Sequence, residues 1–167
     1  MRAFFAPEQR THAPVQELHN GGFIAYAESP ARADALLAAV GDAEMPADRG
    51  EAAICAVHTA DYLDFLKSAP ARWAAAGRPG DVIGYVWPVV GRRPLNLSRI
   101  DALIGQHSFD ASTPLTRHSY HAAYWSVQSA LAALDAVTSG ERTAFALCRP
   151  PGHHAGADYL GGYCYLN

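Results

Sequence analysis

Cysteine and charged residues are both scarce in this sequence. Three cysteines occur in 167 residues, at Cys55, Cys148 and Cys164, and no two of them form a CxxC pair. An odd, widely spaced set argues against a disulfide framework and predicts buried, reduced thiols in an intracellular, cytoplasmic protein. Charged residues make up 17% of the chain and the net charge is -3, with no block of lysine or arginine. The composition therefore predicts no nucleic-acid partner.

Long hydrophobic runs are also lacking, so the sequence predicts no contact with a membrane. The apolar start, residues 1–6, is too short for a signal peptide, and the polar run Pro7-Glu-Gln-Arg10 follows it at once. Hydrophobic residues nevertheless account for 50% of the chain, which is typical of a globular protein. A chain of this length suits one domain with a substantial core.

Short apolar runs alternate with stretches of helical periodicity along the chain. Strands are expected at residues 2–6, 52–57 and 143–148, and residues 7–22 are expected to be irregular. A loop is expected at 78–97, apart from an extended piece at 82–87. This order predicts an α/β fold in which helices join parallel strands.

Three helical regions stand out. The first is expected to be capped by Ser29, to start at Pro30 and to end at Gly41. The second divides into helices at 58–66 and 70–76. The third is the longest and is closed by Ser139-Gly140. Apolar residues at helical spacing predict the buried faces of the first and third helices: Ala33, Leu36, Leu37 and Val40, and then Tyr120, Tyr124, Val127, Leu131, Leu134 and Val137.

The most specialised stretch follows the last predicted strand. It reads Leu147-Cys-Arg-Pro-Pro-Gly-His-His-Ala-Gly156, and it places His153 and His154 side by side beyond a stiff turn. Isolated histidine pairs most often bond to the backbone. At the carboxyl end of a buried strand, however, ligands gather, and imidazoles titrate near neutral pH. We therefore interpret the pair as proton-transfer residues, since neighbouring imidazoles push each other's titration apart.

Other candidate sites are weaker. His118-x-x-His121 has helical ligand spacing but lies beside the apolar stripe, and Cys55-x-x-His58 has no second half. Cys148 and Cys164 lie in apolar runs, which favours inert thiols over nucleophiles. Tyr163, between glycines and Cys164, is either a core aromatic or the wall of a narrow pocket. Asp110 is either a turn-capping carboxylate or the holder of a cation at a pocket mouth.

Arg149-Pro-Pro-Gly-His-His-Ala-Gly156, together with Gly161-Gly-Tyr-Cys-Tyr-Leu-Asn167, resembles the tandem-histidine segment of the zinc-dependent histone deacetylase superfamily. Within it, the similarity is greatest to the bacterial acetylpolyamine amidohydrolases. Supporting matches run through most of the chain, and they include Ser29-Pro-Ala-Arg-Ala33, Val57-His58 and Ser108-Phe-Asp-Ala111. The resemblance implies an arginase/deacetylase-like fold with a parallel sheet flanked by helices, incomplete in this chain. Residues 1–167 would be the N-terminal part of a single catalytic domain.

The resemblance also implies roles for individual residues. His154 would match the general base and acid, and His153 its charge-tuning partner. Gly162 and Tyr163 would match the backbone and the aromatic wall of the acyl-amine tunnel. The zinc ligands and the tyrosine that steadies the oxyanion would lie beyond the end of this chain, so we expect no metal ligand within it.

Two local departures from the family pattern bear on the substrate. Arg117-His-Ser-Tyr120 replaces the usual Pro-Gly-Thr-Trp-like helix start, which affects the entrance loop and any homodimer contact through it. His19 stands where the polyamine enzymes tend to have an aromatic phenol near the tunnel. Asp110 and Glu17 are the carboxylates available at a constricted mouth.

We expect hydrolysis of small acetylated amines, in particular acetylpolyamines, by the zinc enzyme of which this chain is a part. The isolated chain, a truncated product or partial chain, is expected to be inactive alone and to carry an exposed sheet edge. Two alternatives stay open at this point. One is a deacetylase that acts on acetyl-lysine in proteins, and the other is a non-catalytic remnant that serves as a binding module.

Overall fold

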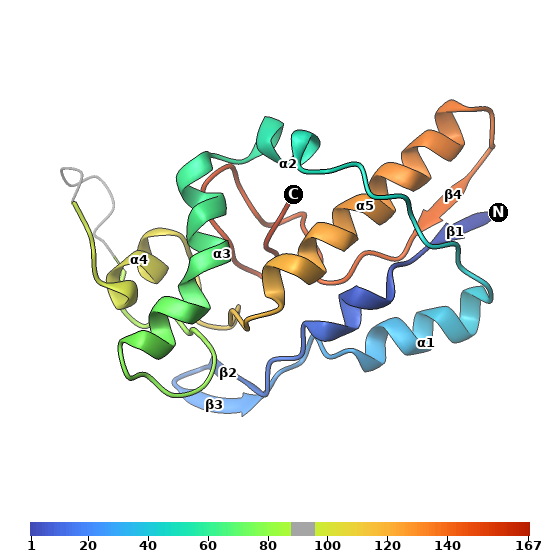
Figure 1. Ribbon diagram of the computed structural model, residues 1–167. Helices are drawn as coiled ribbons and strands as arrows, with labels where there is room; N and C mark the ends of the chain where they lie inside the picture. Colours follow the sequence, from blue (N-terminus) through green and yellow to red (C-terminus); the bar gives the residue numbers. More distant parts are fainter. Residues whose placement is uncertain (88–95) are drawn as a thin grey trace.

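The computed structural model describes residues 1–87 and 96–167. Its elements, in chain order, are β1 (Arg2–Phe4), the 3-10 helix η1 (Pro7–Thr11), β2 (Gln16–His19), β3 (Gly22–Ala25), α1 (Ala31–Val40), α2 (Ala52–Val57), α3 (Ala60–Ala75), α4 (Ile100–Gln106), α5 (Ser119–Thr138) and β4 (Ala144–Ala146) (Figure 1). Within these residues, no helix is both long and apolar enough to cross a membrane. The expected extended piece at 82–87 reduces to a bridge between Val82 and Leu115, and the rest of the expected loop falls largely on residues outside the described part.

A parallel pair of strands brings together segments from near the two ends of the chain. Arg2 aligns with Ala144 and Phe4 with Ala146, which confirms the predicted α/β class with parallel strands. Consecutive strand residues point to opposite faces of a sheet. Phe4 accordingly packs against α5, and Phe5 packs toward α1, so that helices flank the pair on both sides (Figure 1).

The two edges of this pair differ. Beyond β1, Glu44 forms a parallel bridge with Phe4, and backbone bonds link Glu44 to Ala3 and Phe5. Beyond β4, the part of the chain that the structure describes supplies no strand. β4 is only half-buried on this account, although we expected a buried strand.

The longest helix buries a different face from the predicted one. Tyr124 is buried, but Leu134 and Val137 are 57% and 44% exposed. The buried positions are mostly small or polar: Ser119, Ala122, Ala123, Ser126, Gln128, Ser129, Ala132 and Ala136. Small side chains let α5 approach η1 and the strands closely, and hydroxyl and amide groups on the same face bond to neighbouring segments.

Three local predictions need correction. Residues 52–57 are the helix α2 rather than a strand, because a six-residue apolar run has no decisive periodicity, and only Ile54 is buried. The helices expected at 58–66 and 70–76 are one helix, α3, which continues through Pro70 because its buried face includes residues on both sides. In α1, Pro30 is the N-cap without a side-chain bond, so Ser29 does not cap it, and only Ala33 is fully buried.

The main hydrophobic core lies between α3, α4, the first half of α5 and the last residues of the chain. Tyr62 and Tyr165 are completely buried there, and the Tyr62 hydroxyl donates a hydrogen bond to the Tyr165 carbonyl at 2.7 Å. A separate antiparallel hairpin, β2–β3, begins within the segment 7–22, expected to be irregular, and continues to Ala25. Its turn is Asn20-Gly21, with both φ angles positive, which is the strongest short hairpin signal in a sequence.

Candidate active site

The two histidines lie on the loop that follows β4. Leu147 still bonds to Phe4 of the neighbouring strand, and the chain then turns through Pro150 and Pro151. The ring centroids of His153 and His154 are 4.3 Å apart, with the ring planes inclined by 56°. Both side chains are exposed, and within the described residues neither ring nitrogen makes a hydrogen bond. Two open imidazoles therefore stand together at the carboxyl end of a strand.

The first residue of this loop, Arg149, is 2% exposed and anchors the loop; we call it the root. Its guanidinium donates hydrogen bonds to the carbonyls of Gln9, His12 and Glu28 at 2.5–2.8 Å. Its Nε lies 3.1 Å from Oε1 of Glu28 in a buried ion pair. Oε1 of Gln9 accepts a hydrogen bond from the Arg149 backbone amide, and Nε2 of Gln9 donates one to Oγ of Ser129 in α5. The root is thus tied to η1, to α5 and to the segment before α1.

Facing the histidines is a two-residue turn. Gly161 and Cys164 exchange both backbone hydrogen bonds, and the central residues Gly162 and Tyr163 have φ of 57° and 66°. This is the geometry of a tight turn with two left-handed residues. For tyrosine, the left-handed region costs on the order of 1–2 kcal/mol, so other contacts must stabilise Tyr163 there.

Gly162 packs directly against His154. A Cβ atom at Gly162 would lie 2.6 Å from Cδ2 of the His154 ring, closer than side-chain atoms approach. Only glycine permits this contact, and the imidazole therefore rests against bare backbone.

The phenol of Tyr163 is anchored by a buried carboxylate. Its hydroxyl donates to Oε1 of Glu17 at 2.8 Å, and Oε2 of Glu17 accepts the Ala27 amide at 3.2 Å. Burial, together with the bond to this carboxylate, raises the pKa of Tyr163 to about 12. Nδ1 of His19 lies 4.0 Å from Oε1 of Glu17, although the His19 side chain is about half exposed.

Asp110 supports the same turn from behind. Its Oδ2 accepts the Gly162 amide at 2.6 Å and the Thr113 hydroxyl at 3.1 Å, and its Oδ1 accepts the Ser112 amide at 3.2 Å. The structure therefore brings His153, His154, Gly162, Tyr163, Asp110 and Glu17 together, with His19 beside Glu17.

A hollow of about 450 Å³ opens beside the histidines. Its lining combines the loop, the turn and the segment around Glu28: Ala27, Glu28, Arg32, Cys148, Pro151, His153, His154, Gly162 and Tyr163. Burial raises the pKa of the Glu28 carboxyl, against the opposing effect of Arg149 and Arg32. Cys148 is exposed at the rim rather than buried as expected. Its Sγ nevertheless turns toward the Ser126 carbonyl, and the desolvation of the sulfur raises the pKa of the thiol.

Comparison with known proteins assigns this arrangement to a family. The family model of the histone deacetylase domain matches residues 9–167. The chain belongs to the histone deacetylase domain family. It is 42% identical to Acetylpolyamine amidohydrolase 1 of Pseudomonas aeruginosa and 38% identical to the Acetylpolyamine amidohydrolase of Mycoplana ramosa. Each match covers 100% of this chain and 50% of the relative, so the chain spans about half the length of these proteins.

A solved structure agrees with this assignment. The crystal structure of acetylpolyamine aminohydrolase from Burkholderia pseudomallei superposes with a TM-score of 0.92 at 40% identity, over 100% of this chain and 50% of that one. The deacetylase-like fold predicted from the sequence is confirmed, and so is the resemblance to the acetylpolyamine branch of the family.

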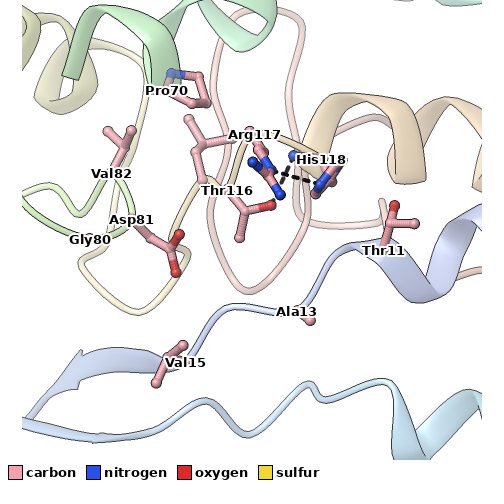
Figure 2. Close-up of a pocket in the computed structure, with 11 residues that line it drawn as sticks. Thr11, Ala13, Val15, Pro70, Gly80, Asp81, Val82, Thr116, Arg117 and His118 are labelled. Carbon is pink, nitrogen blue, oxygen red and sulfur yellow. Dashed lines mark hydrogen bonds between the residues drawn. The ribbon is translucent and has the colours of Figure 1, made fainter. Parts of the chain in front are cut away.

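The weaker candidates lie elsewhere in this histone deacetylase family fold. His118 lines a second hollow, of about 410 Å³, between η1, α3 and the start of α5 (Figure 2). Its Nε2 accepts a hydrogen bond from Nε of Arg117, and the hollow shares no lining residue with the one beside His153 and His154. His121 is exposed near Trp125. Despite the departure at 117–120, α5 begins at Ser119, whose Oγ accepts the Thr116 amide.

A metal belongs to the chemistry of the histone deacetylase family, but the described residues do not form a cage for one. Among residues 1–87 and 96–167, no group of three or more histidine, cysteine or acidic side chains converges as metal ligands would. Cys55 is exposed on α2, and His58 is buried against the end of the chain, where its Nε2 accepts the Asn167 amide. The side chains described here therefore do not fit a complete zinc site, and no step is derived through one.

Sequence reasoning missed several residues that build the site. Gln9, Glu28 and Thr113 are buried and bond to the histidine loop or to the facing turn. Their partners are far away in the sequence, so no local motif marks them. Gln9 and Thr113 also stand among other polar residues in the sequence, so their burial has no local signal.

Proposed function

We propose that this chain supplies the proton-transfer part of a zinc-dependent amidohydrolase that removes acetyl groups from small acetylated amines, acetylpolyamines in particular. The observation that carries the proposal is the pair of open imidazoles beside a wall that holds two carboxylates. The names of the relatives at 38–42% identity support this choice of substrate class.

The histidine pair can manage protons on both sides of the reaction. In this proposal His154, fixed against Gly162, takes a proton from the attacking water and returns it to the departing amine. His153, whose ring centroid lies 4.3 Å from that of His154, helps to orient the attacking water in this proposal. The zinc ligands would come from outside residues 1–167.

The wall favours a cationic amine. Glu17 and Asp110 have no lysine or arginine partner among the described residues, and the only cationic candidate near Glu17 is His19 at 4.0 Å. Neither carboxylate lines the hollow, so their negative charges would act on a substrate ammonium group through the wall, while Tyr163 and Gly162 would enclose the acyl chain. We also infer a cytoplasmic location from the free thiols, and a homodimer that sedimentation analysis would detect.

The decisive experiment assays zinc-dependent hydrolysis of N-acetylputrescine and of an acetyl-lysine peptide. The chain is tested alone and co-expressed with the second half of Acetylpolyamine amidohydrolase 1 of Pseudomonas aeruginosa. Hydrolysis of the small amine by the paired chains, abolished by His154→Ala, is the expected result. Preference for the peptide would favour a protein deacetylase instead. A stable complex without activity toward either substrate would sink the catalytic proposal and leave a binding module.

A further inference from the structure

We propose that Thr113 is a positioning residue for His154, and that it acts through the backbone of the Gly162–Tyr163 turn. This inference rests on the proposed function, because it gives a purpose to the contact between the turn and the imidazole. Thr113 is 2% exposed, is absent from the lining of the hollow, and bonds through its hydroxyl to Asp110 and Tyr163 instead of the histidines.

The Thr113 hydroxyl makes two hydrogen bonds with opposite roles. It donates to Oδ2 of Asp110 at 3.1 Å and accepts the Tyr163 amide at 2.9 Å. The same Oδ2 accepts the Gly162 amide at 2.6 Å. One hydroxyl and one carboxylate oxygen therefore hold two successive amides, and donation to Asp110 directs the lone pairs of the hydroxyl toward Tyr163.

The turn needs partners of this kind. Its own ladder bonds join Gly161 to Cys164, so the amides of the two central residues have no partner within the turn. Both central residues are left-handed, and Tyr163 is a residue that rarely adopts this conformation. The Asp110–Thr113 pair satisfies both amides in the left-handed conformation of the turn.

The position of this turn also determines the position of the His154 imidazole. Gly162 leaves no room for even a methyl group before the His154 ring, so displacement of the turn would move or release the ring. The segment that carries Thr113 is itself fixed, since Leu115 and Val82 exchange two backbone bonds of 2.9 Å. A rigid connection thus runs from the core through Thr113 to the proposed base.

The test compares Thr113→Val, which keeps the shape but removes both bonds, with Thr113→Ser, which keeps the hydroxyl. Thr138→Val, on the far end of α5, is the matched control. NMR on the 167-residue chain would follow amide exchange at Gly162 and Tyr163, and the cross-peak between Gly162 Hα and His154 Hδ2. We expect Thr113→Val to speed Tyr163 exchange about tenfold or more and to weaken the cross-peak, whereas Thr113→Ser and the control stay close to the native chain.

Kinetics of the paired enzyme add a second readout. Thr113→Val is expected to lower kcat for N-acetylputrescine about tenfold with little change in KM, and Thr113→Ser to restore it. Unchanged exchange at Tyr163, or faster exchange with an intact cross-peak and native kcat, would overturn the inference. If Thr113→Val does not fold, Asp110→Asn tests the same pair through Gly162 exchange. If the native protein hydrolyses nothing, the proposed function fails while the NMR comparison still decides the role of Thr113.

Discussion

Arg149 and His154 stand on the same short loop, yet their surroundings are opposite. Arg149 is 2% exposed and bonds to three backbone carbonyls and a buried carboxylate, whereas His154 is exposed and its ring nitrogens are unengaged within the described residues. The root fixes the loop, and the tip leaves its polar atoms free for a reaction. The difference shows how one loop can combine a fixed base with two accessible imidazoles, which is what the proposed proton transfer requires.

The largest expected effect comes from breaking the root. Arg149→Met would leave Glu28 buried without its buried partner, and it would strip the carbonyls of Gln9 and His12 of a donor. We expect a loss of about 3–5 kcal/mol in the free energy of unfolding, measured by urea denaturation. Arg142→Met, at an exposed position, is the control and should cost less than about 0.5 kcal/mol. A loss below about 1 kcal/mol for Arg149→Met would contradict the anchoring role.

Removing the His154 side chain at the tip of the loop should lower kcat and leave the fold intact. His154→Ala in the paired enzyme is expected to lower kcat for N-acetylputrescine about 10²–10⁴-fold. The free energy of unfolding of the chain should change by less than about 0.5 kcal/mol, because the side chain is exposed. His121 is likewise exposed but lies on α5, and His121→Ala should change neither kcat nor the free energy of unfolding. A large loss of stability in His154→Ala would place the tip in the scaffold and erase the contrast with Arg149.

Acid should weaken the contacts around the root through His12, whose carbonyl accepts a hydrogen bond from Arg149. Burial, reinforced by Arg149, lowers the pKa of His12 to about 3 in the folded chain, against about 6.5 when unfolded. Below pH 6.5, the unfolded chain therefore binds a proton that the folded chain does not, so the stability present above that pH is lost as the pH falls toward 3. The loss from His12 is about 1.4 kcal/mol by pH 5.5.

Urea denaturation at several pH values, with His12→Gln as the comparison, would measure this loss. The free energy of unfolding of the variant should depend less steeply on pH, because at most one proton fewer is taken up on unfolding. Some slope should remain, because burial also lowers the pKa of His58. Identical slopes in the native chain and the variant would show that His12 is not the group responsible.

The smallest expected effect concerns the wall opposite the histidines. Tyr163→Phe removes the hydroxyl that donates to Glu17, and the ring stays in place. We expect a cost of about 1 kcal/mol in the free energy of unfolding. Tyr159→Phe, at an exposed position, serves as the control. A cost for Tyr163→Phe close to that of Arg149→Met would mean that the wall contributes to stability as much as the root does.

The sequence predicted the framework well where period and chain order decide the structure. The parallel arrangement of strands, the long helix and the position of His153 and His154 after a strand all follow from such patterns, whereas the pairing of the first strand with the last does not. The prediction for residues 52–57 was wrong because only Ile54 is buried there, and a short apolar run suits a strand or a helix equally. In α5, the stripe of large residues was less informative than the alanines and serines beside it, because close packing favoured the small face.

The site could be predicted only in part. The histidines, Gly162 and Tyr163 lie in one conspicuous stretch, but their supports come from distant segments. Arg149 reaches Gln9 across 140 positions, and Tyr163 reaches Glu17 across 146. Such pairs depend on how the elements pack in space. No local pattern of residues encodes them.

The left-handed tyrosine has a consequence for protein engineering. Any redesign for thermal stability would mark Tyr163 as an unfavourable residue and replace it with glycine or asparagine, which adopt positive φ readily. That change would relieve the turn and discard the aromatic ring together with its bond to Glu17. At this position the relief of backbone strain and the loss of the proposed tunnel wall would come with one substitution, so selection for an unstrained backbone alone would remove the ring.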